Sequence, residues 1–127
     1  MEQYDPDRDL AAGEWLDLDE QERMMLVDDY HRRQRIRMPN VAAHAVAHAI
    51  VENQLVLGEP VVVATLARLR SEGLDRHDAI HAIGSVLSGH LDSLLRDPYS
   101  QDQPNERYHE ALRKLAASEW RARLTGR

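Results

Sequence analysis

Apolar residues recur along most of this chain at the three- and four-residue intervals of an amphipathic helix. Asp19, with Glu22 three residues later, resembles a capping box and predicts a first long helix over residues 20–37. The Pro39-Asn40 pair ends this helix, and the asparagine is suited to cap the next one. We therefore expect an N-terminal segment, residues 1–18, that is partly irregular and is followed by helices.

The second predicted helix carries the segment VAAHAVAHAIVENQL and stops at Gly58. A short turn, Gly58-Glu59-Pro60, leads into a third helix over residues 61–71, because proline is accepted in the first turn of a helix. The run Val61-Val62-Val63 alone favours a strand. The longer helical pattern from Ala64 to Arg70 decides for a helix.

A fourth helix is predicted to start near Asp75, which has Asp78 three residues later, and to run to about Leu95. After a polar loop, a last amphipathic helix covers residues 104–124. Short connections between the middle helices predict antiparallel neighbours. The expected fold is all-α, a compact bundle of about five helices in a single domain spanning residues 1–127.

Composition narrows the class of protein. The chain has no cysteine, which excludes disulfides and thiolate metal sites. Its longest apolar run, residues 61–66, is far too short to cross a bilayer. The acidic start MEQYDPDRDL lacks the order of a signal peptide. We expect a cytoplasmic protein that does not act in a membrane.

The formal net charge is −6, which argues against nucleic acid as a partner because phosphates need a basic surface. The acid excess lies mostly in the first thirty residues, and a basic run, HRRQRIR, follows it at residues 31–37. Acid at the start of a helix and base at its end match the helix dipole. A solvated helix end is therefore the simpler explanation of the basic run.

Two histidine pairs carry the chemistry of the sequence. His44 and His48 are four residues apart, as are His77 and His81, so each pair lies on one face of its helix. Glu52 continues the first row by one more turn. Imidazole suits zinc, iron, nickel and copper, and a carboxylate shifts the preference toward zinc or iron.

If the second and fourth helices are parallel, their histidine faces meet inside the bundle. The sequence then predicts a site for a divalent transition metal, zinc or iron, between the two helices. The predicted ligands are His44, His48, His77 and His81, with Glu52 either as a fifth ligand or as a hydrogen-bonding partner of the ligands. The other histidines, His31, His90 and His109, are isolated and are interpreted as ordinary core or surface residues.

Three catalytic patterns compete for these residues. The segment HDAIH matches the metallopeptidase motif H-E-x-x-H, except that Asp78 is one methylene shorter than glutamate and Leu87 stands where the longer motif has its third histidine. A phosphohydrolase pattern would use the His77-Asp78 doublet with Asp92, but the doublet lies at a helix start, where capping explains Asp78. A di-iron site would need more inward carboxylates than Glu52 supplies.

The segments HAVAHAIVENQ and DRHDAIHAIGSVL together resemble a family of small bacterial proteins of unknown function. Its members carry a His-x3-His-x3-Glu/Asn-Gln block followed by a His-acid-x-x-His block. The resemblance covers residues 39–95, with aspartate at position 78 where glutamate is more usual. It implies importance for these residues without supplying a reaction. The shared positions are His44, His48, Gln54, His77, Asp78 and His81.

Two functions from different classes follow. The first is a metal-binding helical protein, whose enzymatic form would be a metal-dependent hydrolase with Asp78 or Glu52 as the catalytic base. The second is a non-catalytic interaction module, in which the histidines form a buried hydrogen-bonded network. Its exposed helix faces would mediate self-association or bind an acidic protein partner through Arg32, Arg33, Arg35 and Arg37.

Overall fold

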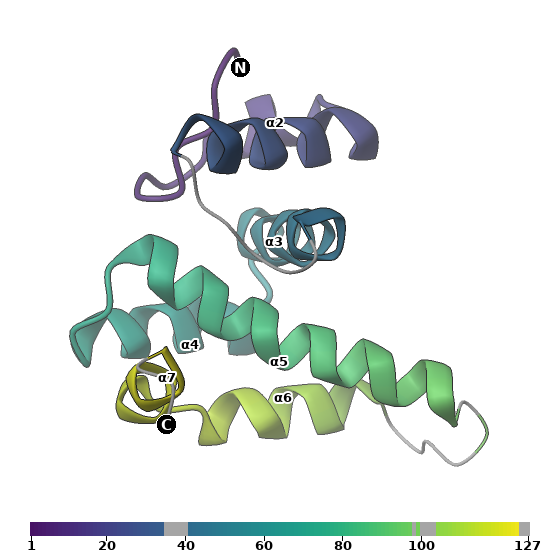
Figure 1. Ribbon diagram of the computed structural model, residues 1–127, viewed down its shortest axis with the longest axis vertical. Coiled ribbons are helices and arrows are strands. Elements are labelled where there is room, and N and C mark those ends of the chain that lie inside the picture. The colour runs from purple at the N-terminus through teal and green to yellow at the C-terminus, as the bar shows by residue number, and fades with distance from the viewer. Residues whose placement is uncertain (35–40, 98, 100–103, 125–127) are drawn as a thin grey trace.

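A computed structural model describes residues 1–34, 41–97, 99 and 104–124 of the chain. These residues form seven helices and no strand, which confirms the all-α class (Figure 1). The helices are α1 (Ala12–Leu16), α2 (Glu20–Arg33), α3 (Val41–Val56), α4 (Pro60–Ser71), α5 (Arg76–Arg96), α6 (Pro104–Lys114) and α7 (Ala117–Leu124).

The helix count exceeds the expected five for two reasons. A short helix, α1, forms within the N-terminal segment and buries Trp15. The expected last helix is divided into α6 and α7, because a tight turn from the Leu115 N–H to the Leu112 carbonyl ends α6. The carboxylate of Glu72 then accepts the N–H of Ala117 at 2.9 Å and caps the start of α7.

Helix α2 starts as the sequence indicates. The Asp19 carboxylate accepts the Glu22 N–H at 2.8 Å, and the Glu22 carboxylate accepts the Asp19 N–H at 3.1 Å, so both halves of the capping box are present. The helix ends at Arg33 rather than near residue 37. The expected break at Pro39-Asn40 and the side chains of Arg35 and Arg37 lie outside the described residues.

The turn at Gly58 sets the direction of α4. Gly58 has a φ of 74° and donates to Leu55, while Glu59 donates to Gln54; this pair of bonds is a Schellman motif. The chain direction changes by 105° between α3 and α4. The two helices are therefore nearly perpendicular, and the expected antiparallel pairing is wrong.

The expected parallel arrangement of the two histidine helices is also wrong. In Figure 1, α3 is seen along its axis while α5 runs across the view, so the two helices cross steeply. The crossing is close, because a methyl group at Gly84 of α5 would lie 3.8 Å from the Cβ of Ala47 in α3. A steep crossing still brings one stretch of each helix together.

Helix α3 separates two hydrophobic clusters and contributes to both. A smaller cluster joins the N-terminal segment, α1, α2 and one side of α3; its buried members are Tyr4, Trp15, Val27, Ala45 and Ala49. The larger cluster joins α3 through Val51 with α4, α5, α6 and α7, and it includes Val62, Leu69, Ile80, Ile83 and Leu112. Helices α2, α3 and α5 therefore meet at the boundary between the clusters.

No single helix in the described parts of the chain is long and apolar enough to cross a membrane. Only α3 and α4 taken together, bent as they are, meet the criteria of length and composition.

Candidate metal centre

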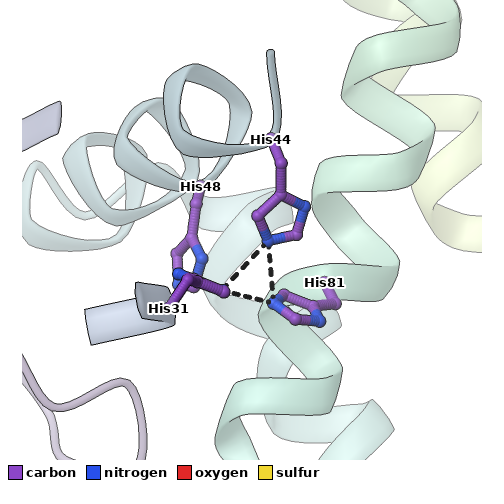
Figure 2. Close-up of side chains that lie close together, drawn as sticks. All are labelled: His31, His44, His48 and His81. Atoms are coloured by element: carbon purple, nitrogen blue, oxygen red, sulfur yellow. Dashed lines mark hydrogen bonds between the residues drawn. The ribbon is translucent and has the colours of Figure 1, made fainter. Parts of the chain in front are cut away.

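Four imidazoles from three helices converge at this boundary. His31 comes from α2, His44 and His48 come from α3, and His81 comes from α5 (Figure 2). One ring nitrogen from each lies within 4.8 Å of the others, which is close enough to hold a metal ion. His31 and His48 are buried, while His44 and His81 are partly buried.

Three of these histidines form a tight triangle of Nε2 atoms, drawn with dashed lines in Figure 2. The Nε2 atom of His44 lies 3.0 Å from that of His81 and 3.2 Å from that of His31, and the third edge is 3.3 Å. Nitrogens bound to one zinc ion at its usual distance lie roughly 3.3–3.4 Å apart at a tetrahedral angle and about 2.9 Å apart at a right angle. The observed edges fall between these values.

Hydrogen bonds alone cannot satisfy this triangle. Each Nε2 atom is either a donor or an acceptor, so at least two of the three must be of the same kind. At least one edge then joins two donors or two acceptors at hydrogen-bond distance. A cation facing all three lone pairs removes this conflict.

The backbone of α2 fixes the tautomer of His31. Its Nδ1 lies 2.8 Å from the carbonyl oxygen of Val27, which can only accept, so Nδ1 carries the proton. The Nε2 of a neutral His31 is then a bare lone pair that enters the triangle. Metal-binding histidines are commonly oriented in this way, by a carbonyl on the other ring nitrogen.

A buried chain of polar groups fixes His48 in the opposite tautomer. The hydroxyl of Tyr4 donates its one proton to Glu52. Its oxygen therefore accepts from the Nε2–H of His48, at 2.7 Å. The Nδ1 of His48 is then a lone pair, and it is buried without any hydrogen-bond partner. The atom that His48 offers to an ion is therefore Nδ1.

Arg76 binds Glu52, the last group in this buried series of hydrogen bonds. Its guanidinium bonds both oxygens of Glu52, at 2.8 and 2.9 Å, in a bidentate pair. Burial and the charge of Glu52 raise the pKa of the Tyr4 hydroxyl well above its usual value, so the hydroxyl keeps the proton that it donates. Both oxygens of Glu52 are thus engaged away from the histidines.

Three of the four imidazoles, those of His44, His48 and His81, are held in their neutral forms. Burial, together with the nearby His31 and His77, lowers the pKa of His44 to about 4. Burial and the histidines His77, His44 and His31 lower the pKa of His81 to about 2. The pKa of His48 is also lowered well below 6.5, first by burial and then by the other histidines. At neutral pH the lone pairs of these three histidines are available without displacing a proton.

His77 lies beside this group and outside the set of four. Its ring centre is 4.1 Å from that of His81 and 5.5 Å from that of His48. Its Nε2 is buried without a hydrogen-bond partner. Burial, followed by the influence of His31, lowers its pKa. His77 therefore lies in the polar interior of the site but is not one of the three corners of the Nε2 triangle.

Asp78, which the sequence suggests as a catalytic base besides Glu52, lies in the first turn of α5. Its N–H donates to the Asp75 carboxylate at 2.8 Å, so the capping expected from the sequence is present. Partial burial raises the pKa of its side chain, and the carboxylates of Asp75 and Asp7 add to that effect while Arg121 opposes it. The charges that act on Asp78 are therefore those of other acids and an arginine.

The structure thus joins three of the histidines expected from spacing, His44, His48 and His81, with a fourth that sequence reasoning missed. His31 has no histidine four residues away. The available signal was its position four residues after the apolar Val27, which places it on the inward face of its helix.

No protein family model matches the chain. Neither a curated protein nor a solved structure matches it. Its function is therefore inferred from the geometry of these side chains.

Proposed function

We propose that the protein binds one divalent transition metal ion, with zinc as the best fit, through His31, His44, His48 and His81. The single observation that carries this proposal is the Nε2 triangle. Its edges of 3.0–3.3 Å suit three nitrogens around one ion, and hydrogen bonding among them leaves a repulsive edge.

An all-imidazole donor set also accommodates iron, nickel and copper. Zinc imposes no geometry through its d-electrons and takes four ligands in structural sites, which matches four histidines from three helices. Because the ligands come from α2, α3 and α5, an ion at this place would join the two hydrophobic clusters. The proposed role is therefore structural in the first instance.

Hydrolysis is the less favoured role. A hydrolytic zinc site keeps one coordination position for water, whereas four protein ligands fill a tetrahedral ion. Glu52 has both oxygens bonded to Arg76 and Tyr4, so it is poorly placed to act as a base. The buried histidine network of the interaction-module hypothesis is disfavoured by the same repulsive edge.

Metal content of the untagged protein tests the proposal. We expect about one ion per chain after reconstitution with zinc, and a melting temperature that falls when the ion is removed with a chelator, because an ion bound only by the folded state stabilises it. His81→Ala should abolish stoichiometric binding. His109→Ala is the matched control, because His109 lies on α6 beside Tyr108.

Two results would overturn the proposal. One is a protein without stoichiometric metal whose melting is unchanged by the chelator. The other is equal metal content in the His81 and His109 variants, which would place the ion elsewhere on the chain.

A further inference from the structure

We infer that the N-terminal segment, residues 4–9, orients one of the ligands of the metal centre. Tyr4 acts as a positioning residue that makes His48 present Nδ1 to the ion, whereas the other three histidines present Nε2. Binding of the ion and docking of the segment then stabilise each other. This inference rests on the proposed function and names a residue that the ligand set does not contain.

Tyr4 is placed to set the tautomer and the orientation of His48. Its side chain is buried and its hydroxyl bridges His48 and Glu52, two groups on α3. Without this hydroxyl, the Nε2 of His48 would lose its acceptor, and the ring could place its proton on Nδ1, the atom that must be free. A hydrogen bond to the outer nitrogen of a metal-bound histidine fixes the tautomer and orients the ring.

The rest of the segment is fastened to the start of α5. The carbonyl of Pro6 accepts from Arg76 at 2.8 Å, and the carboxylate of Asp9 accepts from the same guanidinium at 3.0 Å. Asp7 accepts the backbone N–H of His77 at 3.2 Å. Arg76 therefore joins the segment and the Glu52 carboxylate, and the segment docks one turn from the ligand His81.

Such an arrangement couples two equilibria. If docking of Tyr4 raises the affinity for the ion, the ion must favour docking by the same factor. Removing a group that orients a metal ligand typically weakens binding 10- to 100-fold. We expect a weakening of this size from the loss of a single hydroxyl oxygen.

The test compares the zinc affinity of three proteins by competition with a chromophoric chelator. They are the wild type, Tyr4→Phe and the control Tyr108→Phe. The first variant keeps the ring that packs against Trp15 and Tyr30. The control removes a buried tyrosine hydroxyl that bonds Gln54 at 2.8 Å in the other hydrophobic cluster. We expect a 10- to 100-fold loss for Tyr4→Phe and less than a twofold change for Tyr108→Phe.

Two further readouts separate positioning from general stability. Nitrogen-15 spectra of the zinc-bound wild type should show His48 coordinated through Nδ1 and the other three histidines through Nε2. Hydrogen exchange should show that zinc protects the amides of Asp7 and Arg8, which both bond to Asp5. This protection should appear in the wild type and the control and should be lost in Tyr4→Phe.

The outcomes distinguish the two proposals. A wild type that binds no zinc overturns both. A wild type that binds zinc, with Tyr4→Phe binding as tightly as the control or His48 coordinating through Nε2, overturns this inference and leaves the proposed function standing.

Discussion

The guanidinium of Arg76 and the carboxylate of Glu52 form a two-pronged ion pair in the interior, with side chains that are 3% and 0% exposed. The pair connects α5 to α3 next to the histidines. Removing one partner of a buried pair leaves the other charge without compensation, which is far more costly than the net value of the pair itself.

We expect Glu52→Gln to lower the free energy of unfolding by about 3–5 kcal/mol, because among the described residues Arg76 would keep only Asp9, a largely exposed acid, as an ion-pair partner. Urea denaturation of the metal-free protein measures the loss. The double variant Arg76→Met, Glu52→Leu should lose less than the single variant. A loss below about 1 kcal/mol for Glu52→Gln would show that the pair is not buried as described.

His31 and His77 make a second test, because sequence spacing favours His77 as a ligand and the structure favours His31. We expect His31→Ala to lose stoichiometric zinc, since it removes one corner of the Nε2 triangle. His77→Ala should still bind one ion per chain. Elemental analysis measures the zinc content of both variants. If His77→Ala lost the ion and His31→Ala kept it, His77 would be the ligand in place of His31.

Acid should destabilise the metal-free protein. In the unfolded chain His44 and His81 titrate near pH 6.5, whereas in the folded chain their pKa values are lowered to about 4 and about 2. Below pH 6.5 the unfolded state therefore binds more protons, and stability falls as the pH falls. For His44 the loss is complete only below about pH 4, and for His81 it continues to lower pH.

Both histidines should contribute to this loss in the window between pH 6.5 and 4, each on the order of 1 kcal/mol per pH unit. Urea midpoints measured from pH 7.5 to 4.5 after chelator treatment test this, and His44→Asn should show a shallower dependence than the wild type. A stability that is flat or increases on acidification would contradict the neutral, buried imidazoles.

Substitution by alanine should change the stability of the protein in opposite directions at two glycines. Gly84 lies within α5, and an added methyl would meet Ala47 at an ordinary contact distance of 3.8 Å, so Gly84→Ala should stabilise by about 1 kcal/mol. Gly73 has a φ of 105° in the turn after α4, so Gly73→Ala should destabilise. Thermal melts compare the two, and a destabilised Gly84 variant would show a tighter crossing of α3 and α5.

The parts of the fold that sequence predicts well are those set by local interactions. The capping box of Asp19 and Glu22, the cap at Asp75 and the turn at Gly58 depend on residues a few positions apart. The angle between α3 and α4 depends instead on how whole helices pack, so the expected antiparallel arrangement failed. The last helix is divided by a local turn at Leu115, but the cap that starts α7 comes from Glu72, a partner far away in the sequence.

The distinction between local and long-range interactions also explains which parts of the site the sequence predicts. Helical spacing groups His44 with His48, but it cannot reveal that His31 of α2 faces them. The placement of Glu52 has a geometric cause as well. Successive residues turn by about 100°, so Glu52 lies about 80° around the helix from His44. Its carboxylate therefore meets Tyr4 and Arg76, which are 48 and 24 residues away.

The proposed function depends on one metal ion bound at the Nε2 triangle of His31, His44 and His81. Crystals of the untagged protein grown with zinc, with anomalous data collected at the zinc edge, test it most directly. We expect one strong peak about 2.0–2.1 Å from all three Nε2 atoms, with Nδ1 of His48 on the same ion. Well-ordered histidines with no peak between them, or a peak on other residues, would contradict it.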